Sequence, residues 1–485
     1  MLEYKHSSVT FRKPIKNVES RDDWDYKQLV FPYSEYEGYI SIIVGFFENG
    51  VEWLSIDDII AVYEEQEDFK RIMNKLSNIE RVEFRDHFVD SQIGRFLMKT
   101  GFSNIHNSIC RQSLMIISNL VSDNFVFYSY FCSLGLIREI GNILNQGFIA
   151  HIRSFFDILA TVFGINNKNR SEDSRELLDL VDIHHINNIF SECDHRSLYS
   201  IFYVYYALSF DYPADFFETY IFSIQTFMTK IGIDICIQAN LEDFIEEPSH
   251  SLFYLFDLVT NICNPDTVLH LMTLPYLIEL AHLSIDKSEK TSVLSAINMF
   301  STFIKMCGSS SPRINFFRIL ENIESDDDIL SYHCLCFFQT SFDFNESFAK
   351  ILIAANVLSA ISVVFSRTSF KNKGIIIKII RSAVNLLNYE QKLILIKNGV
   401  LKTIAESLYL EEEEVFMIAF QAYCDLMKNI NESGFPYQFM VQEAINDRLE
   451  NGNEYIEESL KRYIENDNDI MDLLNNGIDT DPEDM

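Results

Sequence analysis

The chain has 485 residues, nearly half of them apolar, and its 41 Phe and 23 Tyr supply bulky side chains for a core. This composition excludes a wholly disordered chain, and the length exceeds what one compact core usually supports, so several domains or an elongated array are expected. The net charge of −32, from 39 basic and 71 acidic residues, opposes binding to nucleic acids and anionic membranes and favours a basic partner.

Residues 1–54 mix Pro, Tyr and charge without a sustained period, so an irregular N-terminal leader is expected there. The N-terminus has no apolar segment typical of a secretory signal. A helix is predicted after Ser55, whose hydroxyl can cap it, with Asp57 and Asp58 in the first turn. Residues 55–99 are therefore predicted to be N-terminal capping helices.

Residues 100–435 alternate apolar segments with short polar joints, and the joints stand out at 164–175, 308–312 and 433–436. One segment places apolar residues at helical spacing, in the order Val415, Ile418, Ala419, Ala422, Tyr423, Leu426, Met427 and Ile430. No long stretch alternates with period two, as a strand would. An all-α fold is predicted.

The C-terminal part, 436–485, is predicted to be an acidic helix and tail. Residues 441–485 hold 14 acids and three bases, a net charge of −11, and residues 455–474 keep enough apolar positions for one amphipathic helix. The longest nearly apolar stretch, 351–365, is shorter than the roughly 20 residues that span a bilayer, so a soluble protein is expected. The odd number of cysteines, nine, favours reduced core thiols, and hence the cytosol or the nucleus.

Internal repeats indicate the architecture. The segment 135–144 matches the segment 399–408 in residue type at seven of ten places, and segments beginning at Pro275 and Asn356 fall into the same frame. In the helix that follows each of these, Asn or Asp precedes two apolar residues. This motif recurs at six positions, Asn119, Asp157, Asp257, Asn298, Asn385 and Asp425, with spacings of 38, 100, 41, 87 and 40. Degenerate copies at Ala207 and Cys336 divide the two long gaps, which gives about eight units of about 41 residues and predicts stacked helices.

The segments 135–144 and 113–121 resemble the second and third helices of armadillo repeats. The resemblance implies a right-handed α-solenoid, an armadillo-like superhelix, across 100–435. In armadillo proteins the third helices line a groove in which a ladder of Asn side chains holds an extended partner peptide. The corresponding ladder would be Asn119, Asp157, Asp257, Asn298, Asn385 and Asp425. The importin-α class has Trp four residues before such an Asn, and this chain has none there, which argues against a nuclear-import receptor of that kind.

The ladder is chemically reasonable because an Asn amide can pair with both the N–H and the C=O of an extended peptide. An Asp can only accept, which favours N–H donors and basic side chains. The alternative is that each residue only lies on a solvated helix face or bonds to a neighbouring loop.

No catalytic or cofactor motif is present, neither a phosphate loop, a nucleophile elbow nor an H-E-x-x-H sequence. The His and Cys residues at 184–195 and 333–336 lack the paired spacing of a zinc site, so neither a metal nor a cofactor is expected. The sequence therefore predicts a non-catalytic scaffold or adaptor whose acidic concave groove holds an extended, basic segment of another protein. The alternative is a regulatory subunit that docks on a catalytic protein through its convex face or its acidic tail.

Overall fold

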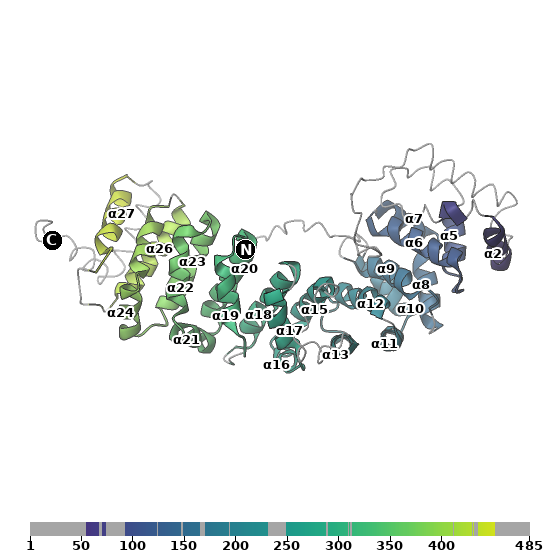
Figure 1. Ribbon diagram of the computed structural model, residues 1–485, viewed down its shortest axis with the longest axis horizontal. Coiled ribbons are helices and arrows are strands. Elements are labelled where there is room, and N and C mark those ends of the chain that lie inside the picture. Colours follow the sequence, from purple (N-terminus) through teal and green to yellow (C-terminus); the bar gives the residue numbers. More distant parts are fainter. Residues whose placement is uncertain are drawn as a thin grey trace, which may run out of the picture. The chain divides into compact units, whose positions relative to one another are not determined.

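The computed structural model describes residues 55–66, 70–73, 93–123, 125–146, 149–164, 170–193, 195–230, 249–287, 290–308, 310, 313–410, 412–428, 430 and 435–451. All regular secondary structure in these ranges is helical, as Figure 1 shows. The predicted leader and most of the predicted tail lie outside them. The contacts divide the chain into two compact units, Met1–Ile231 and Gly232–Met485. This division does not coincide with a predicted domain boundary.

Unit 1 contains ten described helices: α2 (Ile56–Glu65), α5 (Ile93–Gly101), α6 (Ser108–Asp123), α7 (Phe125–Ser133), α8 (Leu136–Asn145), α9 (Ile152–Phe163), α10 (Arg170–Leu180), α11 (Ile183–Glu192), α12 (His195–Leu208) and α13 (Phe217–Lys230). The helix predicted after Ser55 is α2. The Ser55 hydroxyl accepts a hydrogen bond from the backbone N–H of Asp58 at 3.1 Å, and the Asp58 carboxylate accepts one from the backbone N–H of Ser55 at 3.0 Å. The predicted N-terminal cap is therefore confirmed.

Unit 2 contains α15 (Ser249–Ile262), α16 (Val268–Met272), α17 (Leu277–Lys287), α18 (Lys290–Met306), α19 (Phe316–Glu321), α20 (Asp328–Phe344), α21 (Glu346–Ala354), α22 (Val357–Val364), α23 (Phe370–Val384), α24 (Tyr389–Lys397), α25 (Val400–Leu408), α26 (Glu413–Met427) and α27 (Gln438–Asn451). Two short 3₁₀ helices, η3 (Asn322–Glu324) and η4 (Phe365–Arg367), follow α19 and α22. The triplets α16–α18, α21–α23 and α24–α26 each form one repeat of a first, a second and a third helix. In the repeat that ends with α20, η3 takes the place of the second helix.

The repeat frame found in the sequence corresponds to one backbone feature at Gly135, Asn356 and Gly399, and is one residue off in the segment that begins at Pro275, where Tyr276 has this feature. The residue before the second helix adopts a left-handed conformation in all four matched segments, with φ angles of 94° at Gly135, 61° at Tyr276, 58° at Asn356 and 92° at Gly399. These residues precede α8, α17, α22 and α25 respectively. Such a turn redirects the chain from the first helix to the second, and Gly adopts it without steric cost.

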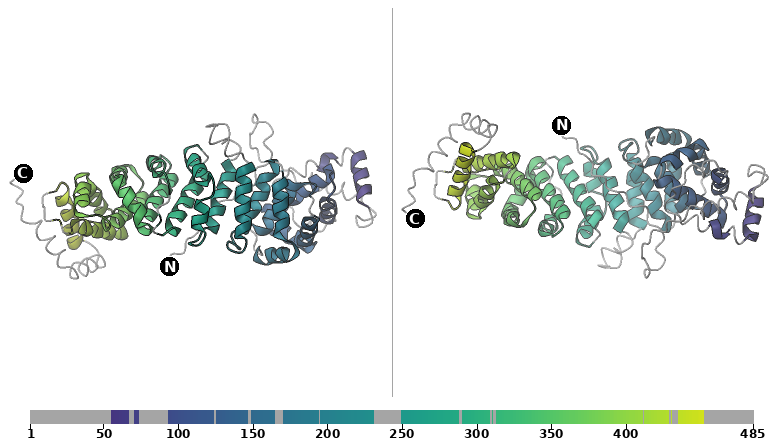
Figure 2. Two further views of the ribbon diagram at one scale, coloured as in Figure 1. Left: turned by 90° about the horizontal axis from the view of Figure 1, so that it is seen from below. Right: turned by 90° about the horizontal axis from the view of Figure 1, so that it is seen from above.

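In each unit, the third helices of successive repeats pack against one another. In unit 1, α6 packs on α9 and α9 packs on α12; in unit 2, α15, α18, α20, α23 and α26 each pack on the next. The repeats of unit 2 lie side by side in Figures 1 and 2. The apolar stripes predicted for these helices are largely buried, including Ala296, Phe300, Ala419 and Leu426, each at 0% exposure. Stacking therefore buries stripes that no single repeat could cover.

The helix α27 continues the packed array beyond its predicted end at 433–436. It contacts α25, buries Val441, Ala444 and Ile445, and follows Tyr437, which has a φ angle of 68°. The guanidinium of Arg448 also donates to the backbone carbonyl of Leu410 at 2.9 Å. This helix thus occupies the second-helix position of a further repeat. The period was not recognised there because the segment carries more charge than the other second helices.

Candidate partner-binding surface

The six predicted ladder residues all lie on third helices or their ends. Asn119 and Asp157 are on α6 and α9 of unit 1; Asp257, Asn298, Asn385 and Asp425 belong to α15, α18, α23 and α26 of unit 2. The two positions that interrupt the ladder are also on third helices, with Ala207 buried on α12 and Cys336 half-buried on α20. We call α15, α18, α20, α23 and α26 the third-helix row. Whether the ladder binds a partner stays a prediction.

The ladder residues differ in exposure. Asn298 and Asn385 are exposed, whereas Asn119, Asp157, Asp257 and Asp425 are half-buried. Asn119 has further interactions of its own. The two exposed asparagines are therefore the ladder members best able to reach a partner.

Asp157 and Asp257 occupy equivalent environments in the two units. Each carboxylate accepts a hydrogen bond from a serine on the next third helix, Asp157 from Ser200 and Asp257 from Ser295. Burial raises the pKa of both carboxyl groups to about 6, although these hydrogen bonds act in the opposite direction. These aspartates join neighbouring helices within their own unit.

Further polar contacts cross the third-helix row. The imidazole Nδ1 of His333 lies 3.0 Å from Oδ1 of Asn298, which joins α20 to α18. The hydroxyl of Ser382 donates to Oδ1 of Asp343 at 2.5 Å, which joins α23 to α20. Burial, with Lys371 and Lys290 nearby, lowers the pKa of His333 and favours its neutral form.

The last contact of this kind joins α23 to α26, where the side chains of Asn385 and Asp425 are hydrogen-bonded. Burial raises the pKa of Asp425, although Arg381 and Lys392 favour its ionised form. The Lys392 ammonium donates to the backbone carbonyl of Asp425 at 2.5 Å. Together these contacts form a polar belt, which consists of Asp257, Ser295, Asn298, His333, Asp343, Ser382, Asn385 and Asp425.

The sequence pattern identified half of the belt and missed its partners. Ser295, His333, Asp343 and Ser382 lie outside the Asn/Asp motif. They become recognisable only when the third helices are aligned side by side, because each faces a residue about 35 to 40 positions away in the sequence. A search for polar pairs at the repeat period could have found them.

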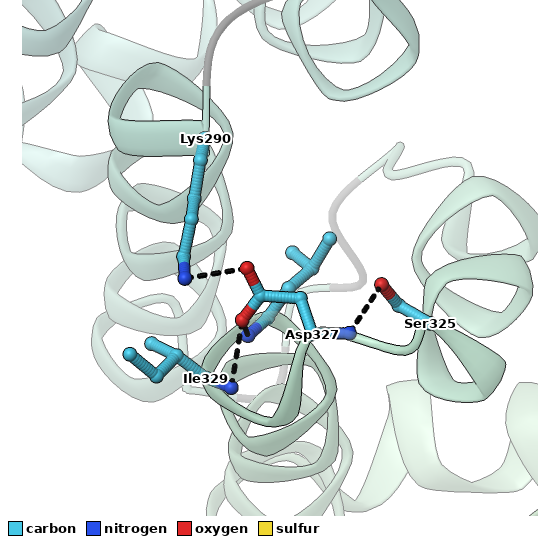
Figure 3. Close-up of polar contacts among 5 residues, drawn as sticks. Lys290, Ser325, Asp327 and Ile329 are labelled. Carbon is cyan, nitrogen blue, oxygen red and sulfur yellow. Dashed lines mark hydrogen bonds and ion pairs between the residues drawn. The ribbon is translucent and has the colours of Figure 1, made fainter.

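An ion pair joins α18 to the amino end of α20 (Figure 3). The Lys290 ammonium lies 2.5 Å from Oδ2 of Asp327, whose Oδ1 accepts from the backbone N–H of Ile329 at 2.9 Å. The hydrogen bond from Lys290 is the main reason that the pKa of Asp327 is lowered. Ser325 accepts a hydrogen bond from the backbone N–H of Asp327 at 3.2 Å. The cap of α20 is thus held by the preceding repeat.

Two lysines of the row contact an aromatic ring on a neighbouring third helix and, within the described residues, no carboxylate. The Lys305 ammonium on α18 lies 5.3 Å from the ring centre of Phe344 on α20, and that of Lys371 on α23 lies 3.6 Å from the ring centre of Tyr332 on α20. Both are cation–π contacts, which leave the positive charge in place. Lys378 differs, because its ammonium pairs with the carboxylate of Glu414 on α26 at 2.9 Å.

The acidic groove expected from the net charge is not supported by the row of unit 2. Its five helices carry six acidic side chains, Asp257, Asp328, Asp343, Glu413, Glu414 and Asp425, and six basic ones, Lys290, Lys305, Lys371, Lys373, Lys378 and Arg381. The acidic excess of the chain therefore lies on other elements. Glu412 is the N-cap residue of α26, and Glu413 and Glu414 lie in its first turn, where carboxylates complement the helix dipole.

The described residues contain no group of three or more His, Cys, Asp or Glu side chains that could hold a metal ion. His333 and His185, two of the histidines considered from the sequence, lie on different helices, α20 and α11. In the same part of the chain no single helix is long and apolar enough to cross a membrane. The pair formed by α21 and 357–367 meets the criteria only jointly, with a bend of 75° between its halves.

No known family model matches the chain, and no curated protein resembles it in sequence. Solved structures do resemble it in fold. The crystal structure of an engineered protein matches with a TM-score of 0.62 and 10% identity, over 89% of this chain and 98% of that chain. A chain from a structure of the cadherin and β-catenin interaction, which a phosphorylation switch controls, matches with a TM-score of 0.55 and 12% identity, over 81% of this chain and 75% of that chain.

A designed armadillo repeat protein also matches, over 50% of this chain and all of its own, but its TM-score of 0.37 is too low to define a fold. The three-helix repeats, their stacked third helices and the two closer structures identify the fold as an all-α solenoid of armadillo-like helical repeats.

Proposed function

We propose that this chain is a non-catalytic scaffold that holds an extended segment of a partner protein along the third-helix row of unit 2. The observation that carries the proposal is the exposure of Asn298 and Asn385 on a row of helices that pack in sequence order. An extended segment brings unpaired N–H and C=O groups, and each exposed amide can pair with them. Asp157, Asp257 and Asp425 instead hold neighbouring helices together.

The charge of the partner cannot be inferred from the net charge of the chain. A basic segment was expected because of the total of −32, but the row carries equal numbers of acids and bases. The proposal therefore concerns an extended protein segment, and neither nucleic acid nor a membrane surface. An intracellular site, in the cytosol or the nucleus, is part of the proposal and is suggested by the cysteines: of the eight in the described ranges, six are buried thiols.

The test is the double substitution Asn298→Ala and Asn385→Ala in the full chain. Each lost hydrogen bond contributes roughly 0.5 to 1.5 kcal/mol, so the affinity for a partner purified after affinity capture should fall about tenfold. The matched control is Asn142→Ala with Asn188→Ala, which removes two exposed amides from α8 and α11. Equal affinity of both double variants for the partner would contradict this function.

The second candidate is a regulatory subunit that docks through another face. The first helices expose large apolar side chains, with Leu269, Phe317, Ile351 and Ile394 between 43% and 56% exposed on α16, α19, α21 and α24. A docking role for the acidic tail concerns residues outside the described ranges. Truncation after Asn451 tests the tail while keeping α27, and loss of partner binding on this truncation would favour this second function.

A further inference from the structure

The charged groups of the third-helix row fall into two sets. Most of its acids are engaged within the protein: Asp257 by Ser295, Asp343 by Ser382, Asp425 by Asn385 and Glu414 by Lys378. Asp328 lies in the first turn of α20, where the helix dipole stabilises a carboxylate. The hydrogen bonds leave the carboxylate charges in place, but α18, α20 and α23 together carry only two acids, Asp328 and Asp343, against six basic side chains.

Within the described part of the chain, four of the six cations of the row form no ion pair: Lys305, Lys371, Lys373 and Arg381. Lys373 is half-buried over the ring of Phe365, and Arg381 favours the ionised form of Asp425 without an ion-pair contact. Two of the four, Lys371 and Arg381, are exposed on α23, and Lys305 is exposed near the end of α18. Between α18 and α23 the available charge is therefore positive.

The spacing on α23 places its polar groups on one face. Lys371, Lys378 and Asn385 are seven residues apart, about two helical turns, and Arg381 falls within the same arc. Lys371 and Arg381 are separated by about 15 Å along the helix axis. Asn385, proposed above as a backbone contact, thus shares its face with these cations.

Exposed aromatic rings accompany the cations. Phe344 at the end of α20 is 53% exposed and lies under Lys305, and Phe370 at the start of α23 is 49% exposed and directly precedes Lys371. Phe side chains bury a large apolar area at interfaces, so both rings can contribute to binding when a partner covers them. A surface of unpaired cations beside exposed rings complements a segment with both carboxylates and apolar side chains.

We propose that the part of the row formed by α18, α20 and α23 binds an acidic, extended segment of a partner protein. Lys305, Lys371 and Arg381 contact its carboxylates, while Phe344 and Phe370 contact its apolar side chains.

Neighbouring helices are spaced by about 10 Å, so the step across from α18 to α23 is roughly 20 Å. Lys371 contacts Tyr332 and Lys305 contacts Phe344, twelve residues further along α20, so the path also runs about 18 Å along the helices and measures roughly 27 Å in all. An extended segment of about eight residues covers this distance.

This inference rests on the proposed function and specifies the chemistry of the partner. It also divides the roles on the row: Asp257 and Asp425 join the helices, Asn298 and Asn385 also contact the backbone of the segment, and the specificity comes from the cations and rings beside them. The charge of the whole chain repels acidic peptides, so binding of one requires a local positive site.

The experiment uses three fluorescein-labelled peptides of about twelve residues, long enough to exceed the path across the row. The first alternates Glu and Phe with Gly and Ser, the second has Lys in place of each Glu, and the third has Gln. Fluorescence anisotropy measures their binding to the full chain. The acidic probe should bind in a saturable manner and more tightly than the other two, and added salt should weaken its binding.

The decisive variant combines Lys305→Glu, Lys371→Glu and Arg381→Glu. It should bind the acidic probe at least about tenfold more weakly, because attraction becomes repulsion at three contacts. The control combines Lys350→Glu, Lys397→Glu and Lys402→Glu on α21, α24 and α25, which changes the net charge equally off the row. It should bind nearly as the wild type does, and circular dichroism should show that both variants are folded.

The variant Phe344→Ala with Phe370→Ala keeps all charges and should also weaken binding of the acidic probe several-fold. Preference for the Lys probe, or equal binding of the acidic probe by both charge variants, would overturn this inference. Either result leaves the proposed function standing if the Asn298 and Asn385 substitutions still weaken capture of the partner. Loss of the asparagine effect alone would instead overturn the proposed function.

Discussion

At the scale of single residues, the left-handed positions before the second helices connect the sequence repeat to the backbone. Gly135 and Gly399 adopt this conformation freely, whereas Tyr276 and Asn356 do so at a steric cost. The matched segments were found because they share a small or polar residue followed by apolar ones. Their common φ angle explains why three of the segments share a frame, whereas the segment that begins at Pro275 was aligned one residue before its left-handed residue, Tyr276.

Substitution of glycine by alanine at two positions of unit 2 should have opposite effects. Gly399→Ala should lower the free energy of unfolding by about 1 to 2 kcal/mol, because Cβ is disfavoured at a φ angle of 92° and no other atom lies near it. Gly374→Ala, inside α23, should raise it by about 0.5 to 1 kcal/mol, because its Cβ would lie 3.5 Å from Val415, an ordinary contact. Urea denaturation measures both, and effects of the same sign would contradict this explanation.

The buried carboxyl group of Asp257 should make stability depend on pH. Its pKa is raised from 3.8 to about 6 in the folded protein, so the folded state binds more protons than the unfolded state between these values. Stability contributed by protonated Asp257 is therefore present below about pH 4 and is lost as the pH rises through 6. Asp257→Asn should thus stabilise the protein at pH 7 by about 3 kcal/mol and have little effect at pH 4.

Denaturation at both pH values measures this difference. The control is Asp266→Asn, which changes an exposed carboxylate on the loop after α15. It should show no comparable change between the two pH values. A gain for Asp257→Asn that is equal at pH 4 and pH 7 would show that burial of the charge is not its cause.

At the scale of helices, the periodicity of apolar residues predicted the third helices well. The reason is that these helices are packed on several sides, so their stripes are wide and regular, as in α18 and α26. The repeat that ends with α20 was less predictable, because η3 replaces its second helix and the acidic stretch around Asp327 caps α20 instead. The charge of the row was not predictable from composition, because acids and bases are distributed unequally among the helices.

The Asn/Asp motif did not predict the partners in the polar belt either. Asn298 contacts His333 and Asp343 contacts Ser382, and both contacts depend on the lateral alignment of neighbouring helices. A sequence motif defined within one helix contains no information about that alignment. The predicted ladder positions are therefore correct in placement on the third helices, while their role in binding stays a prediction.

Truncation should show that α27 belongs to the packed array. A chain that ends after Phe435 loses the buried side chains of Val441 and Ile445 and the hydrogen bond of Arg448 to Leu410. Its free energy of unfolding should fall by on the order of 3 kcal/mol, because each large apolar side chain contributes roughly 1.5 to 3 kcal/mol when fully buried. A chain that ends after Asn451 keeps these contacts and should unfold like the full chain in urea. Equal stability of the two truncated chains would contradict this packing.

At the scale of the whole molecule, the chain is strongly acidic, with a net charge of −32, whereas the third-helix row of unit 2 carries equal numbers of acids and bases. Residues 441–485 alone carry −11, and the remaining excess lies on other elements than the row. A partner that approaches the chain thus meets an acidic protein with a local positive site between α18 and α23. This arrangement favours binding in one place over binding along the whole surface.

Site-specific photo-cross-linking tests most directly whether the row holds the partner. A photoreactive amino acid is placed at Ser301 on α18 or Gln421 on α26, and in separate chains at Ile351 on α21 or Ile394 on α24. With the purified partner, irradiation should yield cross-links from the two positions on the row and few from the two first-helix positions. Cross-links confined to Ile351 and Ile394 would contradict the account and would favour docking through the first helices.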